Sequence, residues 1–231
     1  MWQEVRENLR QRAQGRLEVV TVAMDVGGMA TVAPWVERAA PRHPSLVDTE
    51  HSLGRLFGVV NVPSGIWIDE QGLVVRPPEP AFPGQVTFES EGFDGLSPEE
   101  AETRMALTMR VRVSPRRYLA ALQDWAERGE ASPHRLGPEE VVRRSAPTSR
   151  ESSLAAAEFE IAQHLVSEGH DADAVRHFRE AHRLQPGNWT YKRQAWSLAD
   201  VHQRPTAQYD SDWTSEITRV GPENYYPRLE L

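Results

Sequence analysis

The chain has 231 residues, a formal net charge of −8 and no cysteine. The absence of cysteine excludes disulfides, a thiolate nucleophile and thiolate metal ligands. The acidic balance argues against nucleic acid as a partner, because phosphate binding needs a concentrated basic face. No apolar run approaches the roughly 20 residues that a membrane-spanning helix needs, and the charged start is unlike a signal peptide. We therefore expect a cytoplasmic protein without membrane contact.

The first segments alternate between helical and extended patterns. Apolar residues at helical spacing predict an amphipathic helix over 2–14, and the β-branched run Leu17–Asp25 predicts a buried parallel strand. A helix over 30–40, an extended segment at 43–48 and a short helix over 49–57 follow.

A hairpin and two helices complete the first half. The turn Glu70-Gln71-Gly72 separates a strand at Gly65–Asp69 from a return strand at Leu73–Arg76. Residues 77–98 are rich in proline and glycine and predict an inserted loop with one short strand at Val86–Glu89. A helix is expected over 98–110, an extended stretch at Met109–Val113 and a strong helix from Ser114 to Gly129.

The second half has a helical pattern. Residues 131–150 contain three prolines among charges and predict a linker with a short helix at 138–144. Residues 151–200 predict three helices joined by turns, and the tail 203–231 combines prolines with aromatic residues. That density of aromatic side chains predicts a tail packed on the body of the protein.

The segment GRLFGVVNVPSGIWIDEQGLVVR carries a family resemblance. Its Gly58-Val59, Pro63, Ile68-Asp69 and Gly72 resemble the second half of thioredoxin-like proteins of the TlpA/ResA type, and more loosely peroxiredoxins (the redoxin family). The resemblance implies an α/β thioredoxin-like domain over 1–130, with an insertion at 77–113. It also implies a cis bond between Val62 and Pro63, in a loop that pairs with an extended substrate peptide.

The chain departs from that family at its catalytic segment. The family places a strand and a W-C-x-x-C segment before the first helix, whereas Met1–Val5 here match positions already inside that helix, so both would fall upstream of Met1. The domain is therefore expected to be redox-inactive, and the missing strand would lie between those matching Val19–Met24 and Ile66–Asp69. These two strands could pair directly, Val86–Glu89 or Met109–Val113 could fill the gap, or a second chain could supply a strand. We favour a partner contribution, in a homodimer.

Residues 155–188 resemble one tetratricopeptide repeat, in which two antiparallel helices interlock through small and large residues. The small positions fall on Ala162, Ala174 and Ala181, with Gly169 in the turn; the large positions fall on Ile161, Leu165 and Phe178. The resemblance implies an all-α, tetratricopeptide-like domain over 151–231 that ends in the aromatic tail. Because one repeat cannot bury its own face, it must pack on the first domain, the tail or another subunit.

An aromatic and cationic cluster is the most unusual composition in the chain. It comprises Trp189, Tyr191, Lys192, Arg193, Trp196, Trp213, Tyr225 and Tyr226, and Lys192 is the only lysine in the protein. One interpretation is a pocket for an acidic or planar ligand. The other is that these rings cap the last helix and hold the tail.

Other chemistry has weaker sequence support. Asp25 closes a predicted parallel strand and could form an acid/base pair with His43 or His51, although no spacing brings them together. The eight histidines have no metal-binding spacing, and no phosphate-binding or esterase motif occurs, so neither a metal nor a cofactor is expected. No catalytic residue is identified.

Three functions stay open at the level of the sequence. The leading hypothesis is a redox-inactive thioredoxin-like and tetratricopeptide-like protein that acts as a binding or scaffolding module for a protein or peptide. The first alternative is an N-terminally shortened member of a thiol–disulfide reductase family. The second is an enzyme with non-thiol chemistry in a pocket between the two domains.

Overall fold

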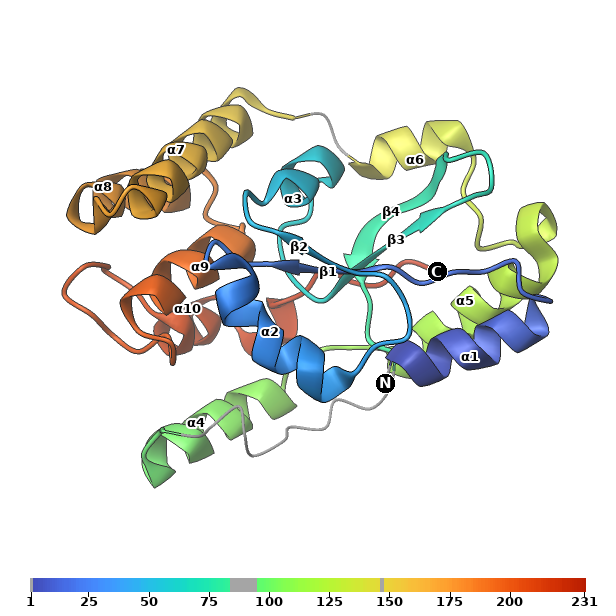
Figure 1. Cartoon of the computed structure of the whole chain (residues 1–231), viewed down its shortest axis with the longest axis horizontal. Coiled ribbons are helices and arrows are strands. Elements are labelled where there is room, and N and C mark those ends of the chain that lie inside the picture. Colours follow the sequence, from blue (N-terminus) through green and yellow to red (C-terminus); the bar gives the residue numbers. More distant parts are fainter. Residues whose placement is uncertain (1, 84–94, 146–147) are drawn as a thin grey trace.

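The computed structural model describes residues 2–83, 95–145 and 148–231, and this part of the chain has a mixed α/β architecture. Figure 1 shows the strands in the middle of the molecule, with α7–α10 at one end and α1, α5 and α6 at the other. Within the described ranges, no helix combines the length and the apolar character needed to cross a membrane.

The first five elements follow the predicted order. They are α1 (Trp2–Arg12), β1 (Thr21–Met24), α2 (Gly28–Ala39), β2 (Ser45–Asp48) and α3 (Ser52–Phe57). Strand β1 pairs in parallel with β2, with Thr21 opposite Ser45 and Met24 opposite Asp48. The Asp48 carboxylate accepts hydrogen bonds from the backbone of Ser52 and Leu53 and so fixes the start of α3.

The hairpin is formed by β3 (Ser64–Ile68) and β4 (Val74–Pro80), which pair in antiparallel fashion. The Val62–Pro63 peptide bond before β3 is cis, as the resemblance implied. Strand β4 continues four residues beyond Arg76, so the prediction of a loop beginning at residue 77 is wrong. Its prolines are compatible with a strand because β4 is paired on one side only, where a missing N–H is tolerated.

One hydrophobic core joins α1, the hairpin and α5 (Pro115–Arg128). The Trp67 ring stacks on Trp125 at 5.0 Å, and its Nε1 donates a 3.1 Å hydrogen bond to the Tyr118 hydroxyl. Gly65 permits this contact, because a Cβ there would lie 2.3 Å from the hydroxyl oxygen of Tyr118. The core thus fixes the hairpin against α5.

Strand β1 is not buried, which contradicts the prediction for Leu17–Asp25. No residue of β1 is buried; Val22 is 37% exposed, and Val20 just before the strand is 52% exposed. A parallel strand becomes buried only when other elements cover both of its faces. In the described part of the chain, β1–β2 and β3–β4 form separate two-stranded sheets.

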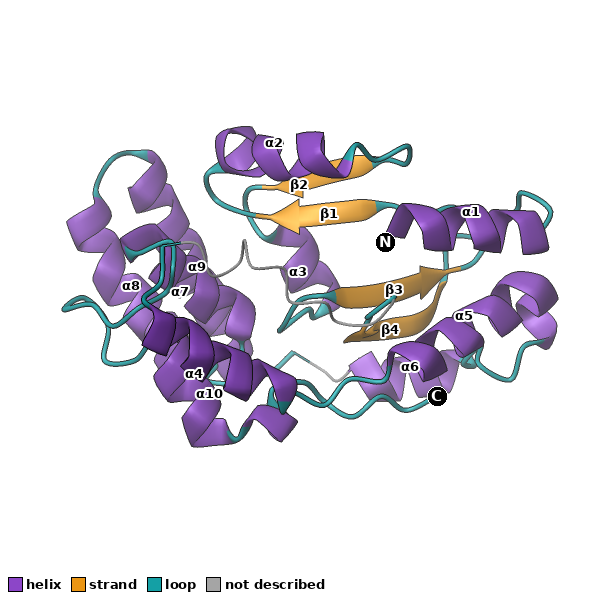
Figure 2. Ribbon diagram, turned by 90° about the horizontal axis from the view of Figure 1, so that it is seen from below, coloured by secondary structure: helices purple, strands orange, loops and turns teal. Residues whose placement is uncertain are grey.

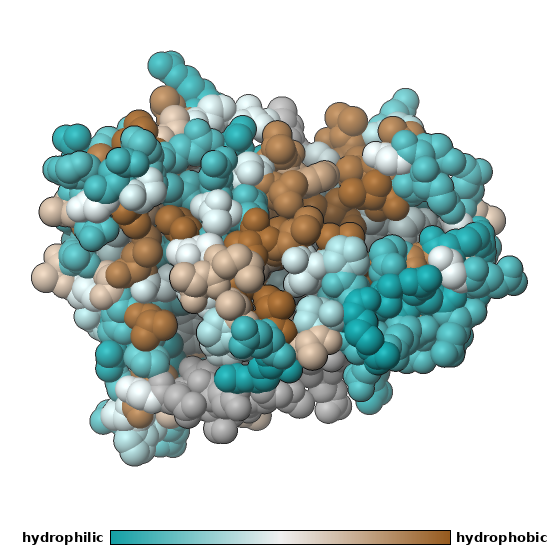
Figure 3. All heavy atoms as spheres, viewed as in Figure 1, coloured by the Kyte–Doolittle hydropathy of each residue, from teal (hydrophilic) through white to brown (hydrophobic). Residues whose placement is uncertain are grey.

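Among the described residues, no segment fills the gap between the two sheets. Met109–Val113 forms no strand, and Val86–Glu89 lies outside the described ranges. Figure 2 shows β1 and β3 on facing edges, with their arrows pointing in opposite directions. Apolar side chains gather over α3 and the strands on the face seen in Figure 3.

The remaining elements are helical. They are α4 (Pro98–Met109), α6 (Pro138–Ser145), α7 (Arg150–Ser167), α8 (Asp171–Leu184), α9 (Trp189–Ala199) and α10 (Trp213–Val220). The sequence predicted all of these except α10, which forms within the tail. The tail itself packs on the protein body, as expected, because Tyr225 and Tyr226 belong to the core that α7–α10 build.

Helices α7 and α8 form an antiparallel hairpin. Ala162, Ala174 and Ala181 are all buried, and Gly169 has a φ of +79° at the turn. These small residues allow close helix packing, and the Phe159 and Phe178 rings meet edge to face at 5.5 Å. Ile161, predicted at a large interlocking position, is instead 44% exposed.

Arg76 is the most deeply buried charged residue of the hairpin, and we expect it to stabilise the fold. Its guanidinium forms a bidentate pair with Glu79 at 2.8 Å and donates to the carbonyl oxygens of His134 and Glu230. Removing one partner of a buried pair leaves the other charge uncompensated. Arg76→Met should lower the free energy of unfolding, measured by urea denaturation, by about 3 kcal/mol.

The matched control is Arg143→Met, which removes an arginine from an exposed pair with Glu140. An exposed pair contributes little, so this change should cost less than about 1 kcal/mol. Equal costs for the two substitutions would contradict the role assigned to Arg76.

Candidate functional site

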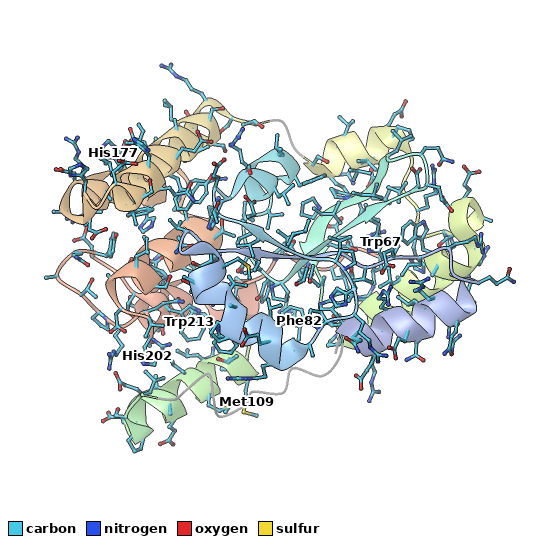
Figure 4. All side chains as sticks on the ribbon, in the orientation of Figure 1. Trp67, Phe82, Met109, His177, His202 and Trp213 are labelled. Carbon is cyan, nitrogen blue, oxygen red and sulfur yellow. The ribbon has the colours of Figure 1, made fainter. Side chains whose placement is uncertain are left out.

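A cavity of about 820 Å³ lies between α4, the end of α9, α10 and the C-terminal tail. Its size falls within the range of about 300–1,000 Å³ that is typical of small-molecule sites. Residues from the segments before and after α4 also contribute. The described lining residues are Trp35, Phe82, Arg104, Met105, Thr108, Met109, Val111, Val113, Pro115, Arg193, Val201, His202, Gln203, Trp213, Tyr225 and Tyr226. Figure 4 labels Phe82, Met109, His202 and Trp213 around this region.

Local capping signals position the helices that form the walls. Ser97 and Glu100 form a capping box at the start of α4, and Asp212 accepts hydrogen bonds from the backbone of Thr214 and Ser215 at the start of α10. Asn188 caps α9 in the same way. These caps determine where each helix begins and therefore which side chains reach the cavity.

The tail is held against the cis-proline loop by hydrogen bonds. The Tyr226 hydroxyl donates to the Val62 carbonyl oxygen at 2.6 Å, and the Asn61 side-chain amide donates to the Tyr225 carbonyl oxygen at 2.9 Å. The backbone N–H of Trp189 donates to the Val60 carbonyl oxygen at 2.7 Å. Burial raises the pKa of Tyr226, so its hydroxyl remains a donor at neutral pH. Pro63 itself stays exposed.

Aromatic and cationic groups meet on one wall of the cavity. The Arg104 guanidinium carbon lies 5.5 Å from the centroid of the Trp213 ring, and Arg104 also donates to the carbonyl oxygen of His202. Trp213 and Tyr225 meet edge to face at 6.3 Å. This arrangement presents a positively charged group beside ring faces, a combination that suits planar or anionic ligands.

The predicted aromatic and cationic cluster is divided between the core and the cavity. Arg193, Trp213, Tyr225 and Tyr226 line the cavity. The other members, Trp189, Tyr191, Lys192 and Trp196, are each at most 6% exposed and belong to the packed interior. Tyr225 and Tyr226 belong to the same core as well, so the cluster packs largely in the interior and borders the cavity at four positions.

Lys192 is engaged in an ion pair. Its Nζ donates to Glu216, and it lies 5.5 Å from the centroid of the Trp189 ring. Glu216 also accepts two hydrogen bonds of 2.9 Å from Arg219. The buried lysine therefore acts as a structural cation between α9 and α10.

Asp25 lies apart from the cavity lining. Its carboxylate accepts from the backbone of Gly27 at 2.8 Å, whereas His51 contacts the Gln194 amide oxygen and His43 the hydroxyl of Thr21. The proposed acid/base pair is therefore not assembled through a direct contact. Burial lowers the pKa of His51, which keeps its ring neutral.

Sequence reasoning missed the half of the site that α4 supplies. Arg104, Met105, Thr108 and Met109 face the cavity, as does Phe82 after β4. The sequence predicted a helix over 98–110; its spacing places Met105, Thr108 and Met109 on one face, but nothing local indicates what this face covers. Across the described ranges, no group of three or more histidine and acidic residues is arranged to hold a metal ion.

Comparison with known proteins gives no match, whether to a family model, to a curated protein or to a solved structure. The inference about function therefore depends on the geometry of the chain itself.

The contribution of the Glu216 carboxylate to stability should depend on pH. Hydrogen bonds from Arg219 and then Lys192 lower its pKa from 4.5 to about 2. A carboxyl group whose pKa is lower in the folded state stabilises the fold above its unfolded pKa, and this contribution is lost as the pH falls. Glu216→Gln should lower the free energy of unfolding by about 2 kcal/mol at pH 7, and the difference should shrink between pH 4.5 and pH 2.

Chemical denaturation of both proteins at several pH values measures this difference. Glu180→Gln is the control, because Glu180 pairs with Arg183 on the exposed face of α8 and should contribute less than about 1 kcal/mol. A pH-independent difference for Glu216→Gln would show that the carboxylate charge is not what stabilises the α9–α10 contact.

Proposed function

We propose that the chain is a thioredoxin-like protein with a tetratricopeptide-like helical part, that it acts as a binding module, and that its ligand occupies the cavity. The observation that carries this proposal is the cavity of about 820 Å³, whose walls present Trp213, Tyr225 and Phe82. These rings pack on the core of α7–α10 and also border the cavity, where their ring surfaces can contact a ligand.

The state of the cis-proline loop supports a binding site outside that loop. In thioredoxin-like proteins this loop offers its backbone to an extended peptide. Here the Val62 carbonyl oxygen already accepts a hydrogen bond from the Tyr226 hydroxyl, and the Val60 carbonyl oxygen accepts one from the backbone N–H of Trp189. A peptide could pair there only after the tail had detached, whereas the neighbouring cavity requires no such change.

The charged residues favour binding over catalysis. Lys192, the sole lysine, is paired with Glu216 in the interior, and Asp25 is hydrogen-bonded within its own turn. Covalent or acid–base chemistry needs a nucleophile or base within reach of the substrate. The described lining residues supply cations and aromatic rings for recognition, and neither Lys192 nor Asp25 is among them.

The cavity predicts a measurable affinity for an uncharged aromatic probe. N-phenyl-1-naphthylamine should bind with an increase in its fluorescence, because apolar surroundings replace water around its rings. Thr108→Trp should weaken this binding at least about tenfold, since the indole fills space on the cavity side of α4.

The matched control is Thr103→Trp, which places the same indole on an exposed position of the same helix. Thermal unfolding should show that both variants fold. Unchanged probe binding by Thr108→Trp would contradict the cavity as the ligand site.

A second candidate function is self-association through β1 and β2, because specific observations favour it. Val20, Val22 and Leu46 are exposed on or beside a two-stranded sheet, and such a sheet has marginal stability without further cover. β1 also has one edge without a strand partner in the described part of the chain. A homodimer would cover this apolar surface and could supply the missing strand contact.

The homodimer predicts a mass of twice 26.1 kDa in sedimentation equilibrium at micromolar concentration. Val22→Lys should shift the mass to that of one chain, because a charge within an apolar interface is costly to bury. Val142→Lys on α6, where the valine is 72% exposed, is the matched control and should leave the mass unchanged. A single-chain mass for the unmodified protein would exclude this candidate.

A further inference from the structure

The charge of the cavity differs from the charge of the chain. Although the protein has a formal net charge of −8, the described lining residues include Arg104, Arg193 and His202 and no aspartate or glutamate. Lining positions with this balance favour a negatively charged ligand group over a neutral or positive one.

Arg193 has unused hydrogen-bonding capacity. Its Nε is shielded from solvent and has no hydrogen-bond partner among the described residues, and none of these residues forms an ion pair with its guanidinium. Because Nε is shielded, an acceptor in the cavity would meet the terminal nitrogens of the guanidinium, which are strong hydrogen-bond donors. The side chain is half-buried and lines the cavity, which makes the cavity the direction from which an acceptor can approach.

Arg104 provides a second cation on the same cavity. Burial lowers its pKa, and the carboxylates of Asp212, Glu100 and Asp200 partly oppose that effect. None of these carboxylates lines the cavity, and that of Asp212 is already engaged by backbone N–H groups at the start of α10. The Arg104 guanidinium therefore faces the Trp213 ring without a direct carboxylate partner among the described residues.

We propose that the cavity binds an organic anion with a planar apolar body, and this inference rests on the proposed binding function. A carboxylate or a phosphate has the geometry to accept paired hydrogen bonds from one edge of a guanidinium. Arg193 supplies the direct contact through the terminal nitrogens of its guanidinium, and Arg104 adds positive charge beside the Trp213 ring. The apolar body of the ligand packs against Trp213, Tyr225 and the apolar side chains of α4.

The test compares indole-3-acetate with indole-3-acetamide, two probes of nearly the same shape that differ in charge. Calorimetric titration of the full chain should give at least about tenfold tighter binding for the acid, because hydrogen bonds to charged groups are stronger than neutral ones. Arg193→Gln should weaken binding of the acid at least about fivefold more than binding of the amide, and so remove most of this preference. Arg193→Lys should retain part of the preference, since it keeps the charge and loses the paired geometry.

Arg183→Gln is the matched control, because it makes the same substitution on the exposed face of α8 and should preserve the preference. Equal affinities for acid and amide, or an unchanged preference in Arg193→Gln, would overturn the anion inference while binding of N-phenyl-1-naphthylamine still supports the cavity. Binding of N-phenyl-1-naphthylamine without measurable binding of either indole would likewise count against the anion inference alone. No binding of any of the three probes would overturn both proposals.

Discussion

The attachment of the C-terminal tail to the loop before β3 is the constraint on which the rest of the structure depends. Asn61 donates to the backbone of Tyr225, and Tyr226 donates to the backbone of Val62. Near the end of the chain, Arg76 donates to the carbonyl oxygen of Glu230. Because the Asn61–Tyr225 bond is buried and the other two are partly buried, releasing the tail would leave polar atoms without partners. The tail therefore connects the hairpin core to the helical core and fixes one wall of the cavity.

The two sheets differ in how deeply they are buried. The hairpin β3–β4 is enclosed by α1, α5 and the tail, whereas the β1–β2 pair contributes no residue to either hydrophobic cluster of the described chain. The hairpin belongs to an apolar core that stabilises a small sheet, whereas β1–β2 contacts α2 without joining either cluster. The β1–β2 layer is consequently the less stable part of the first half and the region whose burial a second chain would most increase.

The sequence predicted those helices and turns whose signal lies in neighbouring residues. The apolar spacing of α1, α5 and α7–α9 and the Gly72 turn of the hairpin needed no tertiary information. Helix α10 was missed although Asp212 is a good cap and Trp213, Ile217 and Val220 share one face, because three prolines in the tail suggested irregular structure. The exposure of β1 could not be predicted, since a β-branched run specifies a strand but not what covers it.

The sequence likewise could not predict which residues the candidate site brings together. The composition of the sequence revealed the aromatic and cationic cluster between Trp189 and Tyr226. Which of its members line the cavity depends on how α9 is rotated and on α4, which lies about a hundred residues earlier in the chain. Trp189, Lys192 and Trp196 share one face and enter the core, whereas Arg193 lies one position further round the helix and reaches the cavity. Only the packing of α4 on α10 brings Arg104 to Trp213.

The net charge of the chain has a consequence for the recognition of an anion. A protein with a charge of −8 repels anions at long range, so long-range attraction cannot be the source of affinity for such a ligand. The favourable contribution has to come from contacts inside the cavity, where the low polarity of the walls strengthens a guanidinium–anion pair. Salt screens the long-range repulsion beyond roughly 10 Å but screens a partly buried pair much less. Affinity for an organic anion in this cavity should therefore change little, or rise slightly, as salt is added, whereas binding to an exposed basic patch weakens steeply.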